Sequence, residues 1–87
     1  MANYKMTLKM LNADSEMKDT GSQDGLNRRD LNLLLRNYKG ILSGLYGTEV
    51  LQTFSKNDKG EGADFLIVAE GEVIKVGSAE IVKVKEE

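Results

Sequence analysis

The stretch from Asn27 to Gly47, NRRDLNLLLRNYKGILSGLYG, carries the longest helical pattern in the chain. At about 100° per residue, its apolar side chains form one continuous stripe. That stripe comprises Leu31, Leu34, Leu35, Tyr38, Ile41, Leu42, Leu45 and Tyr46. Asn27 is suited to cap the first turn, Asp30 to complement the helix dipole, and Gly47 to end the helix. We therefore predict one main helix over 27–47, whose apolar face is suited to pack against a sheet.

The helix side opposite this stripe holds Leu33, Gly40 and Gly44. A glycine inside a helix costs about 1 kcal/mol relative to alanine, so their presence needs an explanation. Either the C-terminal half of the helix is frayed or bent, or the small residues leave a smooth groove for another backbone. The second interpretation makes these three residues candidates for an interaction surface.

The overall composition is that of an ordinary soluble globular chain. Its 87 residues suffice for one domain, and 12 basic and 14 acidic residues leave a net charge of −2. This balance indicates neither a nucleic-acid nor a membrane partner. No apolar run is long enough for a signal peptide or a membrane span, so we expect a cytoplasmic protein, in a host cell if a phage encodes it.

The chain contains no His and no Cys. Disulfides and thiolate chemistry are therefore excluded. The usual general base, the commonest metal ligand and both standard catalytic triads are also missing. We expect the protein not to be an enzyme and to bind no cofactor, metal or small-molecule ligand.

The N-terminal third predicts one strand followed by a loop. Residues 3–11 alternate between apolar and polar side chains, as in a strand with one buried face. Residues 12–26 are polar, and their acidic side chains fit no calcium-loop register. We predict a long solvated loop over 12–26, which remains a candidate contact surface.

The segment after the helix is ambiguous. Residues 48–55 could form a strand or a short helix, and their Val, Thr and Phe content favours a strand. Residues 56–63 read as a turn, because they are rich in Gly, Asn and Asp. Their glycines do not match a nucleotide-binding loop.

The last third, residues 64–85, predicts a β-meander of three short strands over 65–69, 72–76 and 79–84. Glu70-Gly71 and Gly77-Ser78 are suited to the two tight turns. In the resulting register Val68 faces Val73 and Ile67 faces Ile74, while Phe65 lies beside Val76. Across the second turn Val73 faces Val82, Ile74 faces Ile81, and Lys75 faces Glu80.

This register makes both faces of the meander apolar. The face with the larger residues (Phe65, Ile67, Ile74, Val76 and Ile81 among them) is the better match for the helix. The second face carries Leu66, Val68, Val73, Val82 and Val84. One helix covers one face, so the second face is shielded by the 12–26 loop, simply reflects the β propensity of its residues, or is buried by another chain. These five residues are our main predicted interaction site.

Together these patterns predict an α+β fold over 1–87, with a mostly antiparallel four- or five-stranded sheet, one main helix on one face, and the order β-α-β-β-β-β. The order is similar in size and shape to many small bacterial and phage proteins, a similarity that transfers no residue roles. We expect a non-enzymatic protein–protein interaction or assembly module, docking on itself as a homo-oligomer or on a larger protein. The alternative is a weak nucleic-acid binder that uses sheet residues such as Lys5, Lys9 and Lys75, with Tyr4 or Phe54.

Overall fold

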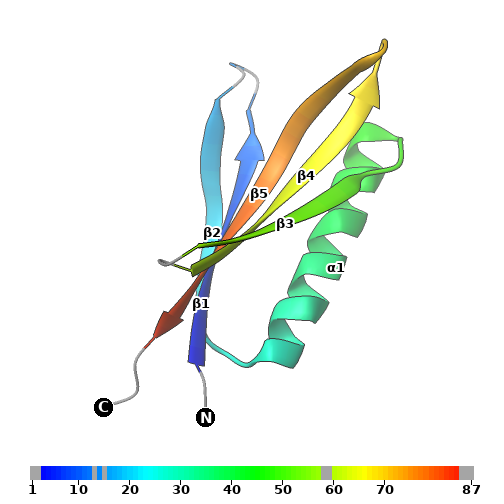
Figure 1. The fold of residues 1–87 in the computed structure, drawn as a ribbon. Helices are drawn as coiled ribbons and strands as arrows, with labels where there is room; N and C mark the ends of the chain where they lie inside the picture. Colours follow the sequence, from blue (N-terminus) through cyan, green and yellow to red (C-terminus); the bar gives the residue numbers. More distant parts are fainter. Residues whose placement is uncertain (1–2, 13, 15, 58–59, 85–87) are drawn as a thin grey trace.

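The computed structural model describes residues 3–12, 14, 16–57 and 60–84, which form five strands and one helix. The elements are β1 (Asn3–Leu11), β2 (Met17–Leu26), α1 (Arg28–Tyr46), β3 (Leu51–Asn57), β4 (Gly60–Ala69) and β5 (Glu72–Val84). All neighbouring strands are antiparallel, in the order β2-β1-β5-β4-β3. Helix α1 lies against one sheet face (Figure 1). The α+β class is confirmed, but the element order is β-β-α-β-β-β, because a second strand precedes the helix.

Both ends of α1 have the predicted caps. The Asn27 side chain accepts a hydrogen bond from the Asp30 backbone N–H at 2.8 Å, and the Asp30 carboxylate accepts one from the Asn27 N–H at 3.2 Å. Reciprocal bonding of this kind satisfies two amide hydrogens that lack a partner within the helix. Gly47 ends the helix at φ 65°, with its N–H donating to the Ser43 carbonyl at 2.9 Å. The helix boundaries thus follow directly from local sequence.

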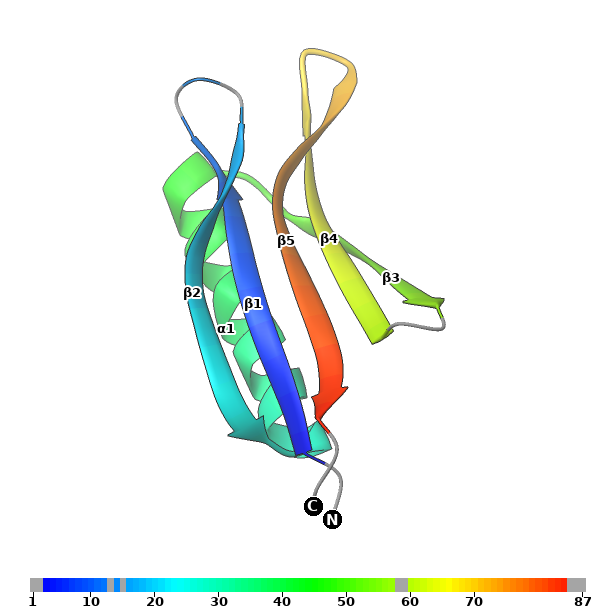
Figure 2. The ribbon, with the colours of Figure 1, turned by 90° about the vertical axis from the view of Figure 1, so that its left-hand side faces the viewer.

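The buried face of α1 is narrower than the predicted stripe. Leu31, Leu35, Tyr38 and Leu42 are buried, and Leu34 and Tyr46 are half-buried. Ile41 and Leu45 were expected in the core but are exposed. They lie on the same flank as Leu34 by helical spacing, and Leu34 lines a cavity with Gly21, Ser22 and Gln23 of β2. Figure 2 shows α1 running behind β1 and β2. Strand β2 carries mostly small and polar side chains, which leave this flank of the helix uncovered.

The predicted loop over 12–26 is wrong, because its last ten residues form β2. This strand pairs with β1 from Leu11 opposite Met17 to Tyr4 opposite Leu26, with two register shifts. Nearly all β2 side chains are exposed, so the strand is held mainly by its backbone hydrogen bonds. An edge strand exposed on both faces has no apolar alternation, which is why its sequence resembles a loop.

The predicted turn at Gly77-Ser78 is also wrong. Strand β5 runs without interruption through both residues, so the predicted pairs Val73–Val82, Ile74–Ile81 and Lys75–Glu80 do not form. The predicted β4–β5 pairs Val68–Val73 and Ile67–Ile74 are confirmed. A bulge then shifts the register, so that Phe65 faces Gly77 instead of Val76.

Gly77 serves packing under the helix and makes no turn. A Cβ atom at this position would lie 2.9 Å from Leu42 Cδ1 and 3.3 Å from the Lys9 carbonyl oxygen. The missing side chain therefore lets α1 approach the centre of the sheet. Beside it, the Tyr38 hydroxyl donates to the same Lys9 carbonyl at 2.5 Å, and the Tyr38 ring meets Phe65 edge to face at 5.2 Å.

The buried core lies between α1 and the middle of the sheet. Its sheet members come from β1, β2, β4 and β5: Met6, Leu26, Ala63, Phe65, Ile67, Val76, Ala79 and Ile81. The ambiguous segment forms strand β3, as favoured, yet none of its described side chains belongs to this core. The predicted turn over 56–63 is wrong for most of its length, since β3 reaches Asn57 and β4 begins at Gly60, and residues 58–59 lie outside the described part of the chain. Within the described ranges, no helix is long and apolar enough to cross a membrane.

Candidate functional site: an open groove between α1 and β3

Strand β3 begins close to α1 and then diverges from it. Val50, directly before the strand, is buried at 1% exposure. Gln52 is half-buried, whereas Phe54 is 67% exposed. These two side chains lie on the inner side of the sheet, because they pair with the buried Phe65 and Ala63 of β4. The decline in burial along β3 follows the widening gap between the strand and the helix (Figure 1).

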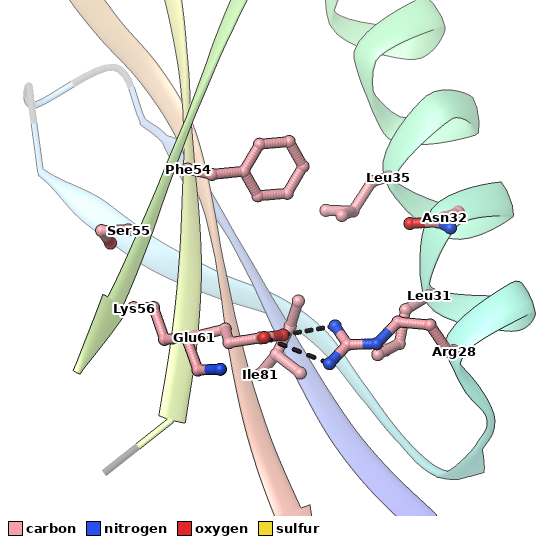
Figure 3. Close-up of a pocket in the computed structure, with 9 residues that line it drawn as sticks. All are labelled: Arg28, Leu31, Asn32, Leu35, Phe54, Ser55, Lys56, Glu61 and Ile81. Carbon is pink, nitrogen blue, oxygen red and sulfur yellow. Dashed lines mark hydrogen bonds and ion pairs between the residues drawn. The ribbon is translucent and has the colours of Figure 1, made fainter. Parts of the chain in front are cut away.

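The gap forms a groove with an apolar interior. Figure 3 shows the Phe54 ring extending from β3 toward Leu35 of α1 across the open space, with Leu31 and Ile81 deeper in the groove. This cavity has a volume of about 210 Å³. A second cavity of about 240 Å³ shares Asn32, Leu35 and Phe54 with it. The groove therefore extends along both sides of the exposed phenyl ring.

An ion pair closes one end of the groove. The Arg28 guanidinium donates two hydrogen bonds to the Glu61 carboxylate, at 2.5 and 3.1 Å (Figure 3). It also lies 4.9 Å from the centre of the Tyr4 ring. The hydrogen bonds from Arg28 lower the pKa of Glu61, and the same contact raises the pKa of Arg28. The pair thus ties the start of the helix to β4, and the Arg28 charge is neutralised within the protein.

The rest of the groove rim is basic. Arg36 and Lys39 come from α1, and Lys56 comes from β3. None of the three forms an ion pair with another described residue. Among the described residues that line the groove, Glu61 is the single acid, and Arg28 already pairs with it. Lys56 lies opposite Glu61 across the β3–β4 ladder, and its charge helps to lower the pKa of Glu61. The groove accordingly combines an apolar interior with a rim of net positive charge.

The five predicted outer-face residues do not form one patch. Leu66, Val68 and Val73 lie together at one end of the sheet, beside Leu51 of β3. Val82 and Val84 lie at the other end of β5, opposite Lys5 and Asn3 of β1. Their separation follows from the missing turn, because a continuous β5 carries residues 73 and 82 far apart.

Charged pairs occupy the outer face between these two clusters. Lys75 lies 3.1 Å from Asp64, and Lys9 lies 2.9 Å from Glu80. All five predicted apolar residues are at least partly accessible, so their placement on the face away from the helix agrees with the prediction. The ion pairs nevertheless divide that surface into two small apolar areas.

The other predicted residues lie on the exposed side of α1. Leu33, Gly40 and Gly44 are all exposed, and an added Cβ atom at either glycine would meet nothing within 4 Å. Helical spacing predicts this placement correctly. These residues share no cavity with the groove, which lies on another side of the helix.

From the sequence, Phe54 was named only as an aromatic residue of the alternative nucleic-acid-binding sheet, and no groove beside α1 was predicted. Its one local signal is a large aromatic residue in the otherwise mostly polar strand segment QTFSK, followed by Lys56. For a metal site the donors are unsuitable: within the described chain, no three carboxylates gather closely enough to hold an ion. Comparison with protein-family models, with curated proteins and with solved structures produced no significant match.

Proposed function

We propose that the protein is a non-enzymatic docking module and that the groove between α1 and β3 is its binding site for another protein chain. The observation that carries this proposal is Phe54, which is 67% exposed on the sheet face that otherwise holds the core. A phenylalanine side chain presents about 150–250 Å² of surface, so covering the exposed part would stabilise a complex by roughly 2–4 kcal/mol. Large aromatic residues beside a pocket are typical anchors of protein interfaces.

The groove is a better docking site than the outer sheet face. The outer apolar areas are separated by the Lys75–Asp64 and Lys9–Glu80 ion pairs. In the groove, Phe54, Leu35 and Leu31 are contiguous around one cavity. A partner that enters it would extend a core that already exists, instead of covering two scattered patches.

Site-specific photo-crosslinking tests this proposal. Benzoylphenylalanine is introduced at position 54 and, as the matched control, at position 73, whose Val is 64% exposed on the outer face. In lysate from the cells that naturally make the protein, position 54 should give discrete crosslinked products and position 73 should not. Excess wild-type protein should compete them away, whereas the Phe54→Asp variant should not. Equal crosslinking from both positions, or none from position 54, would contradict the proposal.

A second candidate function is binding of single-stranded nucleic acid in the same groove. The observation in its favour is that the exposed Phe54 ring has Lys39 and Lys56 nearby, and bases stack on such rings while cations hold phosphates. The net charge of −2 opposes it. Titration of labelled oligonucleotides at low and high salt distinguishes the two, since phosphate contacts weaken steeply with salt.

A further inference from the structure

The uncovered inner side of β3 is about as wide as one helix. Gly77 of β5 lies directly beneath Leu42 of α1. Gln52 of β3 lies two strands away at the same level, since both it and Gly77 pair with Phe65 of β4. Two strand spacings amount to about 9.6 Å, and packed helices lie about 8–10 Å apart. A helix placed beside α1 in the same layer would therefore rest on β3.

Resting on the docking role proposed above, we infer that the occupant of the groove is an amphipathic α-helix of a different protein. Its apolar stripe lies on Phe54, and acidic residues along the neighbouring stripe contact Arg36 and Lys39 of α1. The inner sheet face then carries two helices side by side. The floor of the groove, its wall and the charge of α1 each support this assignment.

The floor of the groove offers one apolar anchor. Phe54 is 67% exposed and points from β3 toward Leu35, near the corner where the sheet meets α1 (Figure 3). One apolar stripe can cover both side chains, because this corner faces a single side of the occupant. The groove-lining residues of α1 run from Arg28 to Lys39, which corresponds to about 16 Å of helix. The site therefore holds about three turns of the occupant.

The wall of the groove presents polar side chains at helical spacing. Asn32, Arg36 and Lys39 recur at i, i+4 and i+7, so they form one stripe along α1. By helical spacing this stripe lies farther from the sheet than Leu35 does. Neither Arg36 nor Lys39 has an ion-pair partner among the described residues. Carboxylates three or four residues apart on a neighbouring helix would complement both charges.

A helix meets both requirements, whereas a β-strand added to β3 does not. Neighbouring stripes of one helix can be apolar and acidic, so its apolar residues face Phe54 while its acids face the wall. On an added strand, alternate side chains point to opposite faces of the sheet. Carboxylates between the apolar residues of such a strand would point away from α1. The position of the basic side chains therefore favours a helical occupant.

The described part of this chain supplies no acidic helix that a second copy could insert. Its one helix, α1, carries a single acid, Asp30, against four basic residues. The Asp30 carboxylate already accepts a hydrogen bond from the Asn27 N–H. Placing α1 of a second copy in the groove would set basic side chains against basic side chains. The charges therefore point to a different protein.

Synthetic peptides test the inference directly. The probe is a fluorescein-labelled helical peptide of about four turns. It has leucines at i, i+3, i+4 and i+7 spacing, glutamates along one side of that stripe, and Ala and Gln elsewhere. One control peptide has lysine in place of each glutamate. A second has the same composition, but its glutamates lie opposite the leucines. A third has a central proline, which breaks the helix.

The expected result has an affinity and a location. Fluorescence anisotropy measures the affinity, and ¹H–¹⁵N spectra locate the site. The acidic amphipathic peptide should bind, with amide shifts over 32–39 of α1 and 52–56 of β3. Each of the three control peptides should bind about tenfold more weakly or worse, because each removes the charge match or the helix.

Variants of the protein provide the second arm of the test. Phe54→Asp, and the double variant Arg36→Glu with Lys39→Glu, should each weaken the acidic peptide by about tenfold or more. The double variant should in turn prefer the lysine peptide, because the charges are exchanged. The matched control Lys5→Glu with Lys18→Glu changes the net charge equally at exposed positions outside the groove and should leave the affinity unchanged. Unchanged amide spectra away from each substitution verify that every variant folds.

Several results would overturn the inference. Equal affinity for the glutamate and lysine peptides, or a double variant that keeps its preference for glutamate, would contradict the charge assignment. Full affinity for the proline peptide would contradict a helical occupant. Amide shifts confined to the outer sheet face would place the site elsewhere, and preferential binding of an oligothymidylate would assign the groove to nucleic acid. No shift with the acidic peptide at about 1 mM would exclude this ligand class.

The docking proposal is tested separately, by the crosslinks from position 54. Specific products that join this position to a basic or an extended segment would preserve the docking role and reject the acidic helix. An absence of products from position 54 would contradict the docking role itself, whichever peptide binds.

Discussion

Phe54 and Ala63 are direct partners across β3 and β4, yet Ala63 is 2% exposed and Phe54 is 67% exposed. Residues paired in this way point to the same face of a sheet, so the boundary of the core runs between two neighbouring strands. The helix covers the inner face as far as β4 and leaves β3 open. An unfilled part of an otherwise closed core is the structural basis of the docking proposal.

This boundary predicts unequal costs for two similar truncations. Phe65→Ala removes a ring that is 0% exposed and should cost about 3–5 kcal/mol of unfolding free energy. Phe54→Ala removes a largely solvated ring and should cost less than about 1 kcal/mol. Urea denaturation of both variants measures the difference. Comparable costs would mean that the groove is closed over Phe54 in solution.

Two glycine substitutions separate the packing role of Gly77 from a turn role. Gly77→Ala should destabilise the protein by about 1–3 kcal/mol, because the new methyl group meets Leu42 and the Lys9 carbonyl. Gly40→Ala, in the exposed helix interior, should stabilise it by up to about 1 kcal/mol. Thermal and urea unfolding report both values. A neutral Gly77→Ala variant would contradict the close approach of the helix at this point.

The Arg28–Glu61 pair predicts a specific pH dependence. Because the pKa of Glu61 is lowered from its ordinary value of 4.5, the pair contributes stability above that pH and loses it as the pH falls through the lower folded-state pKa. Comparison of the wild type with Glu61→Gln should give a difference in unfolding free energy at pH 7 that shrinks as the pH falls below 4.5 and disappears below the lowered pKa of Glu61. The contact is partly exposed, so solvent screening limits the difference to below about 1 kcal/mol. A difference in unfolding free energy between the two proteins that grows on acidification would contradict a stabilising ion pair.

Oligomeric state distinguishes the two kinds of docking that the sequence allows. The basic rim disfavours a second copy, so light scattering should give the monomer mass of 9.6 kDa. The double variant Val73→Lys with Val82→Lys should also be a monomer. These two residues lie at opposite ends of β5 and belong to separate apolar areas, so together they do not form one interface. A mass twice this value that Phe54→Asp reduces to the monomer would instead place a second copy in the groove.

The features predicted correctly are those encoded over a few neighbouring residues. The caps at Asn27 and Gly47 and the turn at Glu70-Gly71 need no knowledge of the rest of the chain. Strand β2 could not be recognised, because an exposed edge strand has no buried face to impose alternation. Gly77 was assigned to a turn because glycine has two uses, a positive φ and a close approach, and only tertiary packing distinguishes them.

The candidate site was hidden for a related reason. Phe54 has the spacing of a core residue and does point to the core side. Phe54 is exposed because α1 and β3 diverge from each other beyond the short segment that links them. The size of this divergence is not encoded in any local sequence pattern. The predicted outer-face residues were correctly placed away from the helix, but the register that grouped them depended on the turn that Gly77 does not make.

The position of β5 has a consequence for how the chain reaches its native state. The β1–β2–α1 segment and the β3–β4 hairpin are adjacent in the sheet only through β5, which pairs with both β1 and β4. During synthesis β5 emerges after all the other described elements. The edges of β1 and β4 that it pairs with therefore stay unpaired until β5 is inserted between them. Closure of the sheet then depends on contacts between distant residues, which slows folding. It also couples the two halves, so we expect them to be gained and lost in one cooperative step.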